Sequence, residues 1–316
     1  MKLAVLDWNT VTMNGDLSPD CFSDFGETRI FSSTSPAETV EHIGNAEAVL
    51  CNKVIIDKDI MDNCPNLRYI GLFATGFNNI DIEFAAKKGI TVCNAGQYST
   101  NAVAQHVFAF ILSHYSRIAE YSSAVKCGEW ERSPVFSYFP IPTHEIAGKT
   151  ISVVGYGSIG KAVAKIADAF GMNVIINTRT APSDCPYETA DIVTAAEKAD
   201  IFTIHCPLTD LTKNLVHKEL IGKMKPSAIL INTSRGATVC EADLADALNN
   251  GKIAAAYLDV LEKEPMSSET PLKNAKNCFI TPHTAWAPLE TRSRLINIVY
   301  DNIKAWTNGC PKNKVN

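Results

Sequence analysis

The chain has 316 residues, of which 46% are hydrophobic and 20% are charged, and its formal net charge is −5. This length and composition predict roughly two globular domains and argue against disorder. The acidic balance, with no long Lys/Arg cluster, argues against a nucleic-acid partner.

No segment predicts a targeting signal or a membrane span. The opening residues MKLAVLDWN have too short an apolar run for a signal peptide and no small-residue cleavage site after it. The longest near-apolar stretch, 103–112, contains Gln105 and His106 and is well short of the roughly 20 residues a bilayer requires. We therefore expect a cytoplasmic protein without a membrane partner.

The ten cysteines are scattered singly, and no CxxC pair occurs. Several lie inside apolar runs, where a free cysteine behaves as a small hydrophobic residue. We therefore expect neither disulfides nor a metal site.

Short β-rich runs alternate with helical patterns, which predicts an α/β fold with parallel sheets. In the first hundred residues the expected strands are LAVLD, AVLCNK, YIGLFATG and ITVCNAG, with helices over Pro36–Ile43 and Ile82–Lys88. A helix opened by the N-cap candidates at 99–101 follows, and then a Pro- and aromatic-rich segment over 130–142.

A second α/β series begins at Ile151 and contains six expected strands, ISVVGYG, MNVIINT, IFTIHCP, AILINTS, AAAYLDV and NCFITPH. Six strands complete a dinucleotide-binding sheet. The long helix expected over Leu289–Thr307 is then left over, so we infer that it packs on the first domain and makes that domain discontinuous.

The glycine-rich segment 155–160 (GYGSIG) follows an apolar strand directly and precedes an amphipathic helix. Its first glycine permits a tight turn, its second lets the backbone approach a pyrophosphate, and its third lets helix and strand pack closely. This context predicts a dinucleotide site, with contacts from Gly155, Gly157, Ser158, Ile159 and Gly160.

The end of the next strand bears on the choice between NAD and NADP. An acidic residue at that place normally binds the ribose 2′-hydroxyl, but the chain has Thr178, Arg179 and Thr180 there. Arg179 and the two hydroxyls could bind a 2′-phosphate, so we favour NADP over NAD. In the alternative, Arg179 stacks on adenine and Thr178 serves NAD.

Three further candidates lie just after later strands, where α/β folds place ligands. They are Arg235 in NTSRG, Glu264 in EKEP and His283 in TPHTAW. Taken one at a time, each could be an ordinary turn or loop residue.

The glycine loop, NTSRG, EKEP and PHTAW, in this order and spacing, resemble the D-isomer-specific 2-hydroxyacid dehydrogenase family. ATGFNNID, YSTNAVAQHVFA and GEWERSP resemble its glycerate dehydrogenase (hydroxypyruvate reductase) branch. The resemblance implies two Rossmann-like, doubly wound parallel-sheet domains with the active site in the cleft between them. Residues 1–99 with 287–316 would form the substrate-binding, flavodoxin-like domain. Residues 100–286 would bind the dinucleotide and include a dimer-forming helix and loop, 100–147.

The resemblance also implies roles for the three candidates. His283 would exchange a proton with the carbonyl oxygen of a small 2-oxo acid while a hydride arrives at carbon. Glu264 would pair with the imidazolium and fix its orientation. Arg235 would bind the substrate carboxylate and polarise the carbonyl.

Further positions follow from the same resemblance. In the first domain, Ala74, Thr75 and Gly76 would offer backbone N–H groups to the carboxylate. Asn52 and Lys53 resemble a second substrate loop, although Lys53 could be an ordinary surface lysine. Cofactor-lining positions would be His205, Cys206, Pro207, Thr233, Ser234 and Asp259. His106, inside a helix, is expected to serve packing or a subunit contact.

The leading hypothesis is an NAD(P)-dependent hydroxypyruvate or glyoxylate reductase, equivalently a D-glycerate dehydrogenase, that forms a homodimer. One alternative is a phosphoglycerate dehydrogenase, for which more basic residues would be expected. The other is a non-catalytic corepressor-like protein that senses NAD(H).

Overall fold

The computed structural model describes residues 1–180 and 182–316, and the chain divides into two compact units. Unit 1 comprises Met1–Ser99 and Ala287–Asn316, and unit 2 comprises Thr100–Trp286. Each unit is built on one parallel sheet, which confirms the predicted α/β fold with two parallel-sheet domains.

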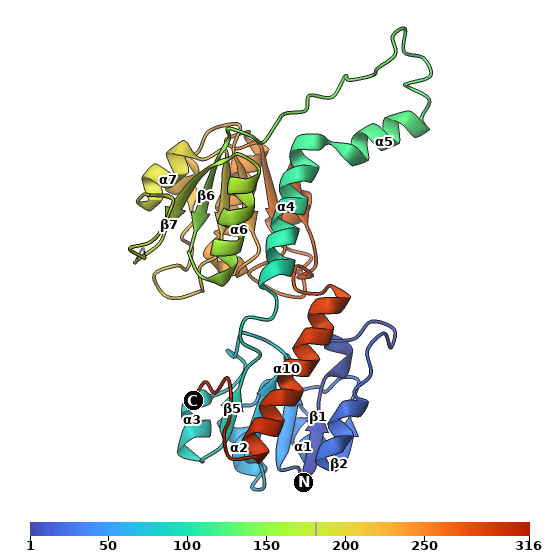
Figure 1. Cartoon of the computed structure of the whole chain (residues 1–316), viewed down its shortest axis with the longest axis vertical. Helices are drawn as coiled ribbons and strands as arrows, with labels where there is room; N and C mark the ends of the chain where they lie inside the picture. Colours follow the sequence, from blue (N-terminus) through green and yellow to red (C-terminus); the bar gives the residue numbers. More distant parts are fainter. Residues whose placement is uncertain (181) are drawn as a thin grey trace. The chain divides into compact units, whose positions relative to one another are not determined.

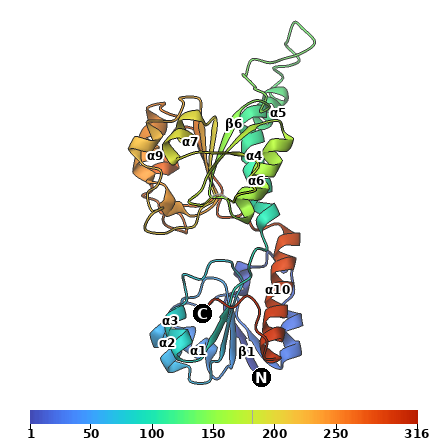
Figure 2. The same ribbon diagram turned by 60° about the vertical axis from the view of Figure 1, so that its left-hand side comes forward.

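Unit 1 contains a five-stranded sheet in the order β2-β1-β3-β4-β5, in which every pair is parallel. Helices α1, α2 and α3 cover one face and the long helix α10 covers the other (Figure 2). The elements are β1 (Lys2–Val5), β2 (Glu27–Ile30), α1 (Thr39–Ile43), β3 (Ala48–Cys51), α2 (Lys58–Asn63), β4 (Tyr69–Leu72), α3 (Ile82–Lys87), β5 (Thr91–Cys93) and α10 (Leu289–Thr307), with 3₁₀ turns at Trp8–Thr10 and Asp20–Phe25.

Unit 2 contains a seven-stranded parallel sheet in the order β12-β11-β10-β9-β6-β7-β8. Helices α4 and α6 lie on one face, and α7 and α9 lie on the other (Figure 2). The elements are α4 (Thr100–Ser116), α5 (Ile118–Lys126), β6 (Thr150–Val154), α6 (Ser158–Ala169), β7 (Asn173–Asn177), β8 (Glu188–Thr189), α7 (Ile192–Lys198), β9 (Ile201–Ile204), α8 (Lys218–Ile221), β10 (Ile229–Asn232), α9 (Glu241–Asn249), β11 (Ala255–Leu258) and β12 (Cys278–Ile280), with 3₁₀ turns at Gly236–Thr238 and Pro271–Asn274.

The central strands form because their sequences are continuous apolar runs. All residues of β3, β4, β9, β10 and β11 are buried, as expected when helices cover both faces of a parallel sheet. The expected count of six strands in the second sheet was wrong, because β8 adds a seventh. Both strands that the sequence analysis missed, β2 and β8, lie at sheet edges and are mostly exposed, so they carry no apolar run.

Helix α10 packs on the sheet of unit 1 through an apolar face. Leu295, Val299 and Ile303 on this helix are buried. The Trp306 ring lies 4.8 Å from the ring of Tyr69 on β4. The last strands of the chain therefore belong to unit 2, whereas the last helix completes unit 1.

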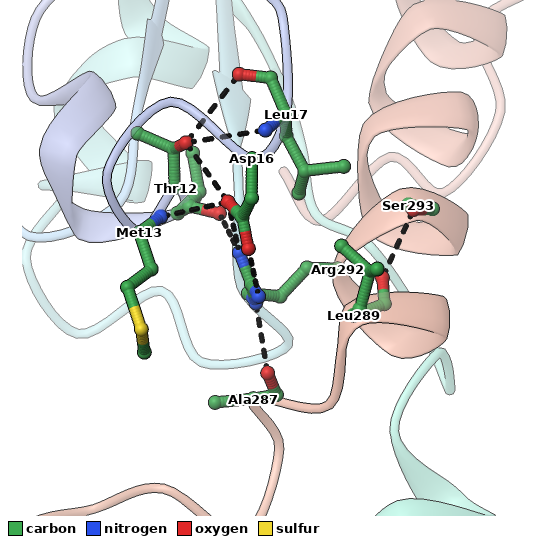
Figure 3. Close-up of polar contacts among 9 residues, drawn as sticks. Thr12, Met13, Asp16, Leu17, Ala287, Leu289, Arg292 and Ser293 are labelled. Carbon is green, nitrogen blue, oxygen red and sulfur yellow. Dashed lines mark hydrogen bonds and ion pairs between the residues drawn. The ribbon is translucent and has the colours of Figure 1, made fainter.

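A buried arginine joins the start of α10 to the loop that follows β1 (Figure 3). Arg292 donates to both carboxylate oxygens of Asp16, at 2.9 and 2.7 Å, and its Nε donates to the carbonyl of Ala287 at 2.8 Å. A bidentate pair of this kind fixes both partners in orientation. The guanidinium lowers the pKa of the Asp16 carboxyl well below its usual range.

A segment with exposed aromatic side chains follows α5 and extends away from the α/β body of unit 2 (Figure 1). Phe136 is 93% exposed and Phe139 is 77% exposed. Hydrogen bonds hold the segment in shape, including Tyr121 Oη to the Ile141 carbonyl and Trp130 Nε1 to the Phe136 carbonyl. No helix in the described part of the chain has the length and apolar character needed to span a membrane.

Candidate active site

The candidate residues of unit 2 gather at one edge of its sheet. The carboxyl ends of parallel strands meet at the same edge, and ligands of α/β folds bind there. Strands β6, β7, β9, β10, β11 and β12 each run directly into a segment that contains a predicted site residue. The seven-stranded sheet therefore brings together residues that are widely separated in the sequence.

The glycine loop between β6 and α6 depends on two close backbone contacts. Gly155 has φ +97°, and a Cβ there would lie 2.7 Å from the backbone nitrogen of Cys206. A Cβ on Gly160 would lie 2.0 Å from the Gly155 carbonyl oxygen. Only glycine fits at either place. These contacts hold the start of α6 against the end of β6.

The middle glycine of this loop has a different environment. Gly157 is the N-cap of α6, and no heavy atom of the described structure lies within 4 Å of the position its Cβ would take. The backbone is therefore bare at the N-terminus of α6, where unpaired N–H groups and the helix dipole attract anions.

A second observation at this edge also fits a dinucleotide. The Oγ1 atom of Thr233 is buried and has no hydrogen-bond partner in the described part of the chain. A buried hydroxyl without a partner costs free energy, so such an atom points to a missing ligand. The open backbone at Gly157 and the unpaired Thr233 hydroxyl together fit a bound nicotinamide dinucleotide.

The residues expected to contact the adenosine ribose follow β7. Thr178 is half-buried, and Arg179 and Thr180 are exposed. Asn177, the last residue of β7, donates from its side chain to the Ala190 carbonyl at 3.0 Å, so it is engaged with its own unit. Arg179 therefore presents its side chain to solvent just beyond the end of β7.

The turn over His205, Cys206 and Pro207 packs against the glycine loop through its backbone. The His205 ring faces Thr203 instead, with its Nε2 atom 2.9 Å from Thr203 Oγ1. Burial lowers the pKa of His205 to about 3, so its imidazole is neutral at physiological pH.

His283 and Glu264 form the closest pair among the predicted catalytic residues. His283 Nδ1 lies 2.6 Å from Glu264 Oε2, and the other carboxylate oxygen accepts a hydrogen bond from the Leu261 backbone at 3.0 Å. The two side chains are 30% and 37% exposed, respectively. With Nδ1 bonded to a carboxylate, the Nε2 atom of His283 is the one available for proton exchange.

Arg235 follows β10 in a turn organised by the buried residue Asn232. The Asn232 side chain accepts from Ser234 and donates to the Arg235 carbonyl. Arg235 itself is exposed, and its guanidinium donates to the Ser234 carbonyl at 2.7 Å. A Cβ on Gly236 would lie 1.8 Å from the backbone of Leu261, so the Arg235 turn touches the loop that leads to Glu264.

Asp259 is 2% exposed, and both its carboxylate oxygens accept hydrogen bonds from the loop that carries His283. Oδ1 accepts from the Thr281 hydroxyl at 2.6 Å and from Thr284 N at 2.8 Å, and Oδ2 accepts from Ala285 N at 2.9 Å. The carboxylate therefore orders this loop directly.

In unit 1, the Asn52–Lys53 loop follows β3 and is held by a residue that the sequence analysis did not single out. The buried carboxylate of Asp7, after β1, accepts Asn52 N at 2.8 Å and Lys53 N at 2.7 Å. Burial raises the pKa of Asp7, although these two N–H groups act in the opposite sense. Asn52 is buried, whereas Lys53 is exposed.

The Ala74–Gly76 turn follows β4, the neighbour of β3, so both predicted substrate loops lie at the carboxyl edge of the first sheet. The carbonyls of Ala74 and Thr75 accept hydrogen bonds from Ala95 N and Asn94 Nδ2, each at 2.8 Å. These bonds fix the turn through its carbonyls.

The sequence analysis gave no role in ordering these loops to two residues, Asp7 and His106. Asp7 lies just after β1, and an acidic residue at the end of the expected strand LAVLD was the signal that could have identified it. His106, expected to serve packing or a subunit contact, lies 3.1 Å from Thr281 Oγ1.

The described residues contain no group of three or more His, Cys, Asp or Glu side chains that could hold a metal ion.

Comparison with known proteins identifies the family of this chain. The family model described as D-isomer specific 2-hydroxyacid dehydrogenase, NAD binding domain, matches residues 108–285. A hydroxypyruvate reductase of Blautia hydrogenotrophica is 39% identical over all of both chains. A glycerate dehydrogenase of Methylorubrum extorquens is 39% identical over 90% of each chain.

A solved structure shows the same relationship. The NADPH-dependent glyoxylate/hydroxypyruvate reductase of Sinorhizobium meliloti, in complex with citrate, has a TM-score of 0.84 and 28% identity, and the match covers 99% of this chain and 97% of that one. The chain therefore belongs to the D-isomer specific 2-hydroxyacid dehydrogenase family and is an NAD(P)-dependent oxidoreductase.

Proposed function

We propose that this enzyme reduces hydroxypyruvate and glyoxylate with NADPH, forming D-glycerate and glycolate, and that the residues identified above carry the reaction. The observation that carries the proposal is the hydrogen bond between His283 and Glu264 at the same sheet edge as the glycine loop. The full-length similarity to a hydroxypyruvate reductase supports the choice of substrate.

In this proposal, the bound cofactor supplies a hydride to the carbonyl carbon of the 2-oxo acid. His283, charged and bonded to Glu264, delivers a proton to the carbonyl oxygen from Nε2. Glu264 stabilises the imidazolium and keeps the ring in one orientation through Nδ1. In the reverse direction His283 accepts the proton from the 2-hydroxyl group.

Arg235 binds the substrate carboxylate and polarises the carbonyl oxygen, because its planar fork of donors matches both oxygens. We also propose that two loops of unit 1 contribute to substrate binding, through the N–H groups of Ala74, Thr75 and Gly76 and through Asn52 and Lys53. Small substrates need no further charged group, since their only anionic part is this carboxylate.

The dinucleotide is held through its pyrophosphate by the backbone from Gly155 to Gly160, including Ser158 and Ile159. Thr178, Arg179 and Thr180 contact the 2′-phosphate and make NADP the preferred cofactor over NAD. The turns at 205–207 and 233–234 line the nicotinamide half, together with Asp259.

We further propose that the enzyme is a cytoplasmic homodimer. The exposed apolar side chains after α4 would be covered by a second copy of the chain, because a monomer rarely leaves so many together in solvent. They are Ile118, Val135, Phe136 and Phe139.

The test is a spectrophotometric assay of NADPH oxidation with hydroxypyruvate, glyoxylate and longer 2-oxo acids. We expect turnover with the two small substrates and a lower KM for NADPH than for NADH. Cofactor binding without turnover of any 2-oxo acid would refute the proposal and favour a sensing role. Activity confined to a phosphorylated 2-oxo acid would instead indicate a phosphoglycerate dehydrogenase.

A further inference from the structure

Helix α4 carries a row of three side chains that contact Tyr257 on β11 and Thr281, the residue just after β12. His106, Phe110 and His114 are spaced four residues apart, so they lie on one helix face. Phe110 lies 5.3 Å from the ring of Tyr257 on β11, and His114 Nδ1 lies 3.2 Å from the Tyr257 hydroxyl.

His106 has a direction-specific hydrogen bond at the end of this row. Its Nε2 atom lies 3.1 Å from the Thr281 hydroxyl, which donates its own proton to Asp259 Oδ1 at 2.6 Å. A threonine hydroxyl has one proton, so the oxygen of Thr281 must accept from His106. The hydrogen bonds therefore run from His106 through Thr281 to Asp259, and His106 carries a proton on Nε2.

Asp259, the last member of this chain of hydrogen bonds, also binds the backbone of the loop that carries His283. The Asp259 carboxylate accepts from Thr284 N and Ala285 N, and its backbone carbonyl accepts from His283 N at 2.9 Å. His283 has φ +55°, in the left-handed region that residues other than glycine rarely adopt. Such a conformation persists when the surrounding contacts fix it.

We propose that His106 is a positioning residue for the reaction, acting through Thr281 and Asp259 on the loop that carries His283. The inference rests on the proposed catalytic role of His283. When the donor at position 106 is lost, the Thr281 hydroxyl is free to turn away from Asp259, and the buried carboxylate loses one of its ordering contacts. The imidazole of His283 then samples orientations that do not meet the substrate carbonyl.

Four variants separate this role from simple packing. His106→Phe keeps an aromatic ring next to Phe110 and removes the donor, and His106→Gln keeps an N–H donor. Thr281→Val removes the linking hydroxyl with almost no change in volume. His114→Phe is the matched control, because it lies on the same helix face but contacts Tyr257 instead of Thr281.

The kinetic readout is kcat at saturating NADPH and 2-oxo acid, with KM for the acid measured alongside. We expect His106→Phe and Thr281→Val each to lower kcat about 10- to 100-fold with little change in KM. The double variant, which carries both substitutions, should have a kcat no lower than that of the single variants. His106→Gln should stay near wild type, as should His114→Phe. Wild-type kcat in His106→Phe, or a double variant whose loss is the product of the two single losses, would overturn the proposal.

A second measurement keeps this test separate from the choice of substrate. The comparison uses whichever 2-oxo acid the wild-type enzyme reduces best, and if it reduces none, the proposed function fails by itself. The second measurement is amide hydrogen exchange in peptides that cover residues 280–286, compared between His106→Phe and His114→Phe. If His106→Phe fails to fold, Thr281→Val is measured in its place. Faster exchange than in His114→Phe supports the positioning role, and equal exchange contradicts it.

Discussion

Gly157→Ala should separate cofactor binding from folding, because the two flanking glycines of the loop are packed and Gly157 is open. Nothing lies within 4 Å of the position of the added methyl group, and φ at Gly157 is −78°, which alanine adopts freely. Alanine is a poorer N-cap than glycine by about 0.5–1 kcal/mol. Alanine also lowers the conformational entropy of the unfolded chain, which stabilises the folded protein by about 0.4–1 kcal/mol. The net change in stability should therefore be close to zero.

The effect on cofactor affinity should be much larger. In the proposed complex the pyrophosphate lies against the backbone of Gly157, so a methyl group there overpacks the contact. Overpacking by one carbon costs about 1–3 kcal/mol, which corresponds to an increase of about 5- to 150-fold in the Kd for NADPH. The assay is a titration of NADPH fluorescence, with the melting temperature recorded on the same sample.

Two other alanine variants provide the comparison. Gly160→Ala places a methyl group 2.0 Å from the Gly155 carbonyl, so it should fail to fold normally. Gly222→Ala, at the C-cap of α8 with φ −63°, should leave the Kd unchanged. A folded Gly157→Ala enzyme with wild-type affinity for NADPH would refute the placement of the pyrophosphate at this loop.

Three further predictions concern the reaction, the cofactor and stability. His283→Gln should lower kcat by roughly 10²–10⁴, and near-normal turnover would exclude an acid–base role for this residue. Arg179→Ala should raise the Kd for NADPH about tenfold or more, because one charge-assisted hydrogen bond is lost. The Kd for NADH should change little. Equal effects on the two Kd values would show that Arg179 does not contact the 2′-phosphate. Asp16→Asn should lower the melting temperature at pH 7, because Arg292 holds the pKa of Asp16 below its unfolded value. This stabilisation is complete above the unfolded pKa of about 3.9 and is lost as the pH falls below it, so a deficit that stays constant down to pH 3 would contradict the assignment.

The fold class could be predicted because the central strands are buried on both faces and therefore appear as continuous apolar runs. Edge strands lack that requirement, which is why β2 and the two-residue β8 gave no signal. The glycine loop could be recognised because its function depends on backbone approach, and only glycine permits the contacts of Gly155 and Gly160.

The supporting residues of the site could not be read in the same way, because their partners are distant in the sequence. His106 lies on a helix, and its partner Thr281 follows an edge strand 175 residues later. Asp7 binds backbone N–H groups 45 and 46 residues away, and a backbone group leaves no trace in residue identity. A pattern within one element predicts its buried face, but a hydrogen bond between elements depends on the final packing.

The interrupted course of unit 1 has a consequence for the order in which the protein forms during synthesis. The strands β1 to β5 leave the ribosome first, yet one face of their sheet is covered by α10, which follows the whole of unit 2 in the sequence. Unit 2 is continuous and has its own core on both faces of its sheet, so it can complete its fold earlier. The nascent chain therefore holds an unfinished first sheet while the second one forms, and a ribosome stalled before residue 289 would display Tyr69 and its neighbours without the cover of Trp306.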